Sequence, residues 1–412
     1  MKKLINLVVF FVVFSAIVHG QENEYKFVIK KELASTPVKN QSLTSTCWSF
    51  SGLSFFESEL IRKGREEYDL SEMYIVREAY KKKAREYARR SGGCAFGGGG
   101  QYNDLISICK EAGLVPDGVF PGLPFGQKNH NHDEMDAVLK GYMDGLLKST
   151  KLTPAWYQGF NGILDAYLGK MSIGFEYEGK YYTPGNFKEE LGLNLDDYIV
   201  ISSFSDHPFY KEALLEVPIN WAPGSYYNLP LDDFIEVIDN SIMSGYTVAW
   251  ACDMRGKGFS MKYGVAVVPR EEWNDISPEE QKNIFFSPHA QKTVTQDIRQ
   301  KVFANYEITG DHGMHIIGIA EDQEGNVFYK VKNSWGHTGK YDGYLFVSRE
   351  FLKLKTTNCM INKNALPASI AQKLGIENIE LQAGAIADTR RVEEEDMKQL
   401  VPSNTPGVPM AQ

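Results

Sequence analysis

The chain has little of what would bind it to nucleic acid or hold it in a membrane. Its 412 residues carry 44 Lys and Arg against 53 Asp and Glu, and the net charge of −9 argues against non-specific nucleic-acid binding by the whole surface. Beyond residue 20 no apolar run is long enough to span a bilayer. There is no internal repeat, and 43% apolar residues in this length suffice for one large or two moderate domains.

The one long apolar run lies at the N-terminus. Lys2 and Lys3 precede an apolar stretch over residues 4–14, and Gly20 follows as a small residue at a cleavage site. This pattern predicts an export signal over residues 1–20; the alternative is an anchor helix, for which the run is short. No cysteine follows the cut, which argues against a lipid anchor. We therefore expect an exported, periplasmic or secreted protein rather than a cytoplasmic one, without a stable membrane span after cleavage.

Cysteine is scarce. An odd number of cysteines in an exported chain indicates at least one free thiol. A chain of this size does not need disulfides for stability, so we expect most of its cysteines to be free, although their spacing fixes no pairing. The five are Cys47, Cys94, Cys109, Cys252 and Cys359.

Two motifs that suggest a bound phosphate or metal are incomplete. Residues 97–100 are four glycines, but they lack the spacing and the lysine of a phosphate-binding loop. Such a tract lets backbone approach a ligand closely, and its alternative is a flexible loop. His130-Asn131-His132 has no carboxylate or cysteine placed to complete a metal site, so we expect no metal. The basic run over 81–90 is typical of a solvated helix face, with a local anion or nucleic-acid patch as the alternative.

Apolar periodicity predicts a mixed α and β chain, with most of the strands in its second half. We expect an extended arm over 21–40, one domain over 21–368 with an insertion over about 125–230, and a tail over 369–412. The insertion contains a hairpin around Gly179. The predicted helices are 48–62, a second opened by Ser71 as its cap, one following the glycine tract, 133–147, 153–168 and 231–243, and the predicted strands are 247–251, 314–319, 326–332 and 344–348.

Cys47 stands at the start of a predicted helix, and this position suits a nucleophile. A thiol reacts as thiolate, and its ordinary pKa of about 8.5 leaves little thiolate at neutral pH. The positive end of a helix and a neighbouring imidazolium both lower that pKa. The sequence therefore predicts a resting thiolate–imidazolium pair that attacks a carbonyl carbon, after which the histidine protonates the leaving amine.

Gln41 lies six residues before Cys47 and can reach the same reaction centre. The tetrahedral intermediate of acyl transfer carries an oxyanion that needs hydrogen-bond donors. The side-chain amide of Gln41 and the backbone N–H of Cys47 would supply two, each worth about 3 kcal/mol.

Two histidines compete for the role of general base and acid. His312 and His315 are three residues apart near the start of a predicted strand, so they point to opposite faces of the sheet. Gly313 leaves room for a close approach beside His312, so we assign the role to His312 and expect His315 to be a packed or solvent-facing residue. Asn333 would hold the far nitrogen of the ring and fix its tautomer, and Trp335 would shield that bond from water.

Together these residues resemble the catalytic blocks of papain-type cysteine peptidases. The blocks are Gln41 with Cys47-Trp48, Asp311-His312-Gly313 and Asn333-Ser334-Trp335-Gly336. The resemblance implies that Cys47 is the nucleophile and His312 the general base and acid. It also implies that Asn333 orients the histidine and that Gln41 is an oxyanion donor. It also identifies Gly99 and Gly100 with the glycine pair that hydrogen-bonds the substrate backbone.

Within that family the chain resembles the bleomycin hydrolase and aminopeptidase C branch. More than half of the chain separates Cys47 from His312, as in that branch. The resemblance implies an α+β, papain-like two-lobe fold, with a helical lobe, a β-barrel-like lobe and large helical insertions. It implies an aminopeptidase that acts on peptides without a metal or cofactor, and a homo-hexamer, since relatives are ring hexamers. The segments that match are Gly100-Gln101-Tyr102, Leu114-Val115-Pro116, Tyr198-Ile199-Val200, His207-Pro208 and Trp250-Ala251-Cys252-Asp253.

The chain departs from this branch at both ends. In relatives the C-terminal residues lie in the cleft, block its non-primed side and anchor the substrate's amino group; here the tail is longer and acidic. Relatives are usually cytosolic, whereas this chain carries an export signal. If the tail leaves the cleft open, an endopeptidase or dipeptidyl peptidase is the alternative. A non-catalytic peptide-binding relative and an enzyme that transfers the acyl group to an amine are further alternatives.

Overall fold

The computed structural model describes residues 24–222 and 224–377. The predicted export signal over 1–20 and most of the predicted tail lie outside these ranges. Across the described ranges, every helix is too short or too polar to cross a membrane.

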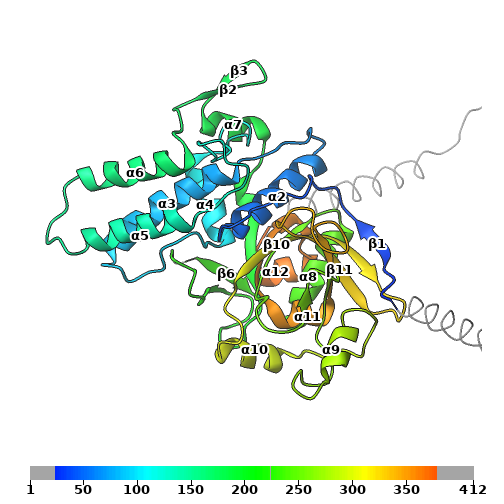
Figure 1. Cartoon of the computed structure of the whole chain (residues 1–412). Coiled ribbons are helices and arrows are strands. Elements are labelled where there is room, and N and C mark those ends of the chain that lie inside the picture. The colour runs from blue at the N-terminus through cyan, green and yellow to red at the C-terminus, as the bar shows by residue number, and fades with distance from the viewer. Residues whose placement is uncertain (1–23, 223, 378–412) are drawn as a thin grey trace, which may run out of the picture.

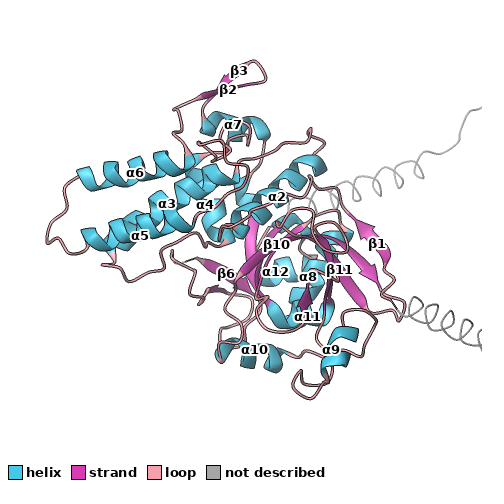
Figure 2. Cartoon of the chain, viewed as in Figure 1, coloured by secondary structure: helices cyan, strands magenta, loops and turns pink. Residues whose placement is uncertain are grey.

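The chain folds into a helical lobe and a sheet lobe that lie side by side (Figures 1 and 2). In the helical lobe α3, α5 and α6 lie next to one another, and a small hairpin of β2 and β3 stands beyond α7 (Figure 1). The elements of this lobe are α2 (Cys47–Arg62), α3 (Glu72–Arg89), α4 (Tyr102–Ala112), α5 (Asp133–Leu146), α6 (Ala155–Leu168), β2 (Phe175–Tyr177), β3 (Lys180–Tyr182), α7 (Pro184–Leu191) and the 3-10 turn η1 (Leu195–Asp197).

The sheet lobe contains one sheet of eleven described strands. Its order is β5-β6-β4-β13-β7-β10-β11-β12-β9-β8, with β1 added to β10, and most neighbours are antiparallel. The strands are β1 (Val28–Glu32), β4 (Tyr198–Ser202), β5 (Glu212–Leu214), β6 (Ser225–Asn228), β7 (Val248–Cys252), β8 (Phe259–Ser260), β9 (Val265–Ala266), β10 (His312–Glu321), β11 (Val327–Lys332), β12 (Tyr344–Ser348) and β13 (Thr356–Asn362).

Five helices and a turn complete the sheet lobe. They are α8 (Leu231–Met243), α9 (Pro278–Asn283), α10 (Gln296–Ala304), α11 (Arg349–Lys355), η2 (Lys363–Ala365) and α12 (Ala368–Leu374). Val237, Ile238 and Ile242 of α8 are fully buried against the apolar side chains of the central strands. One hydrophobic cluster fills the helical lobe and extends onto one face of the sheet at Val200, Ala249 and Met360, and a second cluster lies with α8 on the other face. The fold class predicted from the resemblance is confirmed.

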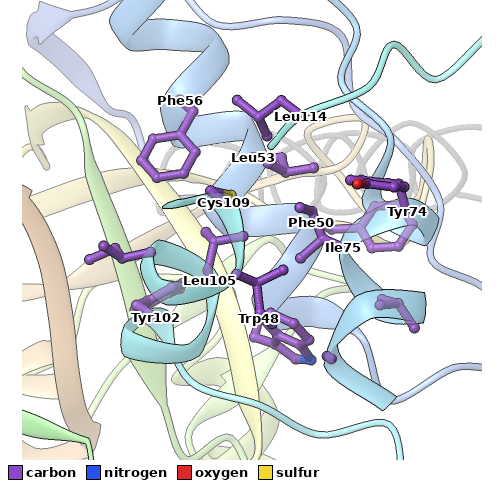
Figure 3. Close-up of a cluster of buried hydrophobic side chains, with 14 of the residues drawn as sticks. Trp48, Phe50, Leu53, Phe56, Tyr74, Ile75, Tyr102, Leu105, Cys109 and Leu114 are labelled. Carbon is purple, nitrogen blue, oxygen red and sulfur yellow. The ribbon is translucent and has the colours of Figure 1, made fainter. Parts of the chain in front are cut away.

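Helix α2 belongs to the hydrophobic cluster of the helical lobe and also packs against the sheet. Every residue from Cys47 to Leu60 is buried, as expected for a helix that is covered on all sides. One side packs on α3 and α4, where Leu53, Phe56 and Leu105 belong to the cluster of Figure 3, and another side packs on β10. Because β10 begins at His312, this packing fixes Cys47 and His312 relative to each other.

Two predicted boundaries differ from the structure. The tail was predicted from residue 369, but α12 continues the fold because Ile370 and Ala371 are buried in the sheet-lobe core. The insertion was predicted to end near 230, but β4, β5 and β6 join the main sheet beside β13. The short elements α9 and α10 went unpredicted, since α9 buries no residue and α10 only Arg299, which leaves no apolar periodicity to find.

All five cysteines are free, and Cys94 is the one among them that is not buried. This confirms the expectation that most of the thiols are unpaired.

Candidate active site

A cleft of about 890 Å³ lies between the lobes and collects most of the predicted site residues. Its helical-lobe wall includes the glycine tract, and its sheet-lobe wall includes residues 251, 254–255 and 309–313. Asn333 does not line the cleft and lies behind His312. The predicted residues that line it are Gln41, Cys47, Gly99, Gly100, His312 and Trp335.

Cys47 is the first residue of α2, as the sequence predicted within one residue. The Thr46 carbonyl accepts the N–H groups of Ser49 and Phe50, which starts the helical hydrogen-bond pattern. The first N–H groups of a helix have no partner within it, so those of Cys47 and Trp48 remain at its open end. They supply partial positive charge where the thiol sits, and the Cys47 N–H is one of the two predicted oxyanion donors.

Gln41 is held by two hydrogen bonds. Its Nε2 donates to the Thr44 carbonyl (2.8 Å), and its Oε1 accepts from Ser334 Oγ (2.6 Å). An amide nitrogen carries two hydrogens, so one N–H of Gln41 is left to donate into the cleft. Ser334 was not assigned a role from the sequence; it joins the glutamine to the segment that carries Asn333.

The partner of His312 is Asn333. His312 Nε2 lies 2.8 Å from Asn333 Oδ1, and the same oxygen accepts the Ser334 N–H at 2.8 Å. Since Oδ1 is the acceptor in both bonds, His312 carries its hydrogen on Nε2 and keeps a lone pair on Nδ1. The lone pair is what a general base needs to take the proton of a thiol.

Trp335 stands beside this pair. Its ring centroid lies 4.9 Å from that of His312, and the ring of Phe259 packs against it edge-on with a centroid distance of 6.1 Å. His312 is 6% exposed and Asn333 2% exposed, so the hydrogen bond between them is sheltered from water. This is the placement that the shielding role of Trp335 requires.

The two histidines of β10 lie on different faces. A side chain at Gly313 would come 2.8 Å from Ser51 Oγ and 3.3 Å from the Cys47 carbonyl, so glycine lets β10 lie against α2. His315 faces the same way as Gly313 and is fully buried, with its Nδ1 2.9 Å from Ser54 Oγ. The structure therefore places His312 in the cleft and His315 in the packed interior.

Burial acts against the charged forms of both Cys47 and His312, and the resting ion pair stays a prediction. Burial raises the pKa of Cys47 to about 11, although the backbone N–H groups of Gly313 and Trp48 act in the opposite direction. Burial also lowers the pKa of His312 to about 4, opposed by its hydrogen bond to Asn333. Both shifts have the same cause, because each charged form loses solvation in the cleft, and the attraction between a thiolate and an imidazolium acts against both. The sequence could not show how deeply the pair is buried.

This arrangement would allow the Cys47 thiol to attack a carbonyl carbon as its proton moves to His312 Nδ1. The transfer separates charge within the pair but brings no net charge into the cleft, and the two opposite charges attract each other once formed. The protonated ring then donates its proton to the leaving amine, and water repeats the sequence on the thioester. In this arrangement the Cys47 N–H and the second N–H of the Gln41 amide are the predicted donors to the oxyanion.

A pH profile tests which protonation state the pair has at rest. We expect kcat/KM to fall as the pH drops through about 4, because a protonated ring cannot accept the proton of Cys47. We also expect the rate of Cys47 alkylation by iodoacetamide to rise steadily above pH 8, as for a thiol whose pKa is raised. An alkylation rate already maximal at pH 6 would instead show that the ion pair exists at rest.

The cleft contains no cluster of metal ligands among the described residues. The one group of three ligand side chains in those ranges is Asp206, His207 and Glu216, which lies outside the cleft. The rings of His130 and His132 are 5.9 Å apart, but no third ligand joins them within the described part of the chain.

Comparison with known proteins agrees with the geometry. Residues 175–385 match the model of the peptidase C1-like family, and residues 26–143 match that of the papain family cysteine proteases. Aminopeptidase C of Lactococcus lactis subsp. cremoris is 23% identical over 376 residues, with 81% of this chain and 82% of the relative covered. Bleomycin hydrolase of Rattus norvegicus is 26% identical over 429 residues, with 90% of each chain covered.

A solved structure shows the same fold. The crystal structure of PepW from Lactobacillus rhamnosis superposes with a TM-score of 0.66 at 21% identity, covering 84% of each chain. The peptidase C1-like model alone matches more than half of the sequence. The chain therefore belongs to the peptidase C1-like family, and it is a papain-type cysteine peptidase of the bleomycin hydrolase and aminopeptidase C branch.

Proposed function

We propose that this enzyme is an aminopeptidase that removes residues from the N-terminus of peptides through a Cys47 thioester. Relatives that bear the names aminopeptidase C and bleomycin hydrolase support the assignment. In this proposal His312 is the base and acid, Asn333 orients it, Gln41 stabilises the oxyanion, and Gly99 and Gly100 bind the substrate backbone.

One observation in the cleft favours an exopeptidase. Pro218 and Ile219, from the connection between β5 and β6, line the same cleft as Cys47. Ile219 Cγ2 lies 3.4 Å from the position where a side chain at Gly99 would begin, which is direct contact. A peptide that runs along the glycine tract away from Cys47 therefore meets this segment. We infer that this contact limits the length of the acyl portion that fits on that side.

The test compares aminoacyl fluorogenic substrates with a free or a blocked amine. We expect the free-amine substrate to be cleaved about 10- to 100-fold faster, the range that a hydrogen bond to a charged group supplies. Equal rates would overturn the aminopeptidase and indicate an endopeptidase. Release of residue pairs from a longer peptide would indicate a dipeptidyl peptidase.

Substitution of Ile219→Gly tests the role of the connecting segment. If this segment closes the cleft, the variant should cleave blocked substrates faster than the wild type does, because the contact with Gly99 is gone. Ile173→Gly is the control, since that side chain is 90% exposed in the insertion.

A variant that lacks residues 378–412 tests whether the tail contributes. If this variant gains activity on blocked substrates and Ile219→Gly does not, the tail and not Ile219 closes the cleft.

A further inference from the structure

Lys83 of α3 is a buried ammonium at the edge of the cleft. Its side chain is among the largest fully buried ones, with the residue 2% exposed, and it reaches the cleft beneath the glycine tract. Its Nζ donates to the carbonyl of Gly97 (2.6 Å) and to the carbonyl of Gly99. The catalytic chemistry described above makes no use of this residue.

The Gly98 carbonyl, which lies between those of Gly97 and Gly99, is also held by a side chain of the helical lobe. Trp48 Nε1 donates to the Gly98 carbonyl at 2.9 Å. Gly100 lies flat on the same indole, because a side chain there would come 2.7 Å from Trp48 Cε2. Three consecutive carbonyls thus accept hydrogen bonds from side chains of α2 and α3, two of them from Lys83. A four-glycine segment has the highest conformational freedom of any backbone, so these bonds decide its shape.

Stability alone does not explain a lysine at this position. A buried ammonium costs free energy unless it is well paired, and Lys83 donates to two neutral carbonyls rather than to a carboxylate. Burial lowers its pKa to about 8, and Asp104 and Asp136 only partly offset that effect. An apolar side chain would fill the space at a lower cost, but it would leave the carbonyls of Gly97 and Gly99 without a donor.

We propose that Lys83 is a positioning residue that holds residues 97–100 in the conformation that binds the substrate backbone. The proposal rests on the substrate-binding role of Gly99 and Gly100 in the proposed function. Lys83 acts through the backbone carbonyls and not on the reacting atoms. Its loss should therefore weaken peptide binding and leave the reactivity of Cys47 largely unchanged.

The charge of Lys83 gives the proposal a pH dependence. The groups that face its ammonium are Asp104 of α4, Asp136 of α5, Cys94 and the rings of Tyr80 and Trp221. As the pH rises through about 8 the ammonium loses its proton, and its hydrogen bonds to the two carbonyls weaken. We therefore expect KM to rise above that pH while kcat changes less.

The experiment uses Lys83→Met with Lys82→Met as the matched control. Lys82 is the next residue of α3 and donates to Ser107 and Glu111, away from the cleft. We expect Lys83→Met to raise KM about tenfold with kcat changed less than about threefold, the loss that one charge-assisted hydrogen bond supplies. Its rate of Cys47 alkylation and its melting temperature should match those of Lys82→Met.

Several results would overturn the proposal. An unchanged KM in Lys83→Met shows that the glycine tract needs no lysine. A parallel loss of Cys47 alkylation shows that the substitution disturbs the whole site. If Lys83→Met does not fold, KM of the wild type is followed from pH 6 to 10, and a flat KM contradicts the proposal.

A binding measurement separates this proposal from the proposed function. Calorimetry compares the affinity of an unblocked and an N-acetylated peptide for Cys47→Ser and for Cys47→Ser combined with Lys83→Met. We expect both peptides to bind more weakly when Lys83 is replaced, whichever of them the wild type cleaves. If affinity is retained the lysine proposal fails, whereas cleavage of blocked peptides by the wild type contradicts only the aminopeptidase.

Discussion

Replacing His312 by alanine is expected to reduce kcat/KM by at least about 10⁴-fold, the scale seen when a member of a catalytic nucleophile–base unit is removed. The reason lies in the burial of Cys47, which raises the pKa of its thiol to about 11. Without the Nδ1 lone pair, almost no thiolate forms at neutral pH, and the leaving amine has no proton donor. Steady-state kinetics on a fluorogenic aminoacyl substrate measures the loss.

His315→Ala is the matched control, because it removes a histidine of the same strand from the other face. His315 is packed beside Ser54, whose Oγ also accepts from Lys332 Nζ (2.8 Å). This variant should lose thermal stability, since it leaves a cavity and a broken polar network, but it should keep kcat/KM within about tenfold of the wild type when assayed well below its melting temperature. The opposite ranking of the two variants would show that His315 is the base.

Much of the site could be predicted because each role demands a residue type in a local pattern. A nucleophile at a helix start needs only the residues around Cys47, and the capping serine of the second helix, Ser71, was predicted for a similar local reason. The choice of His312 over His315 used only the alternation of side chains along a strand, and the structure places them as predicted. Their chemical roles remain predictions that the variants above test.

The features that escaped prediction depend on contacts between distant segments. Lys83 stands in a basic run that is typical of a solvated helix face, yet its burial depends on how the glycine tract and α4 fold over α3. The contact of Ile219 with Gly99 joins residues far apart in the chain. The pKa shifts of Cys47 and His312 likewise follow from burial, which no local pattern reveals. The residue types of the site could therefore be predicted from local sequence, whereas the burial and the long-range contacts that tune them could not.

Replacing Cys47 by serine is expected to abolish peptide hydrolysis, with a loss of at least about 10⁴-fold in kcat/KM. Serine nearly matches cysteine in size, so the fold around α2 should be kept. Its hydroxyl holds its proton far more tightly than a thiol does. Burial weakens the His312 ring as a base, so it removes that proton far less readily than the proton of a thiol. The measurement is the residual rate together with the melting curve, which should match that of the wild type.

Iodoacetamide distinguishes this nucleophile from the other four thiols. Cys109, Cys252 and Cys359 are fully buried and have raised pKa values, which leaves Cys94 as the competing accessible thiol. At pH 8 we expect loss of activity to follow labelling of the peptide that contains Cys47, to be slowed by a peptide substrate, and to proceed at the same rate in Cys94→Ser. A chain that only binds peptides would keep Cys47 unlabelled and would turn over no substrate before or after treatment. Inactivation that tracks Cys94 instead would remove Cys47 from the mechanism, because a nucleophile must be the thiol that the substrate protects.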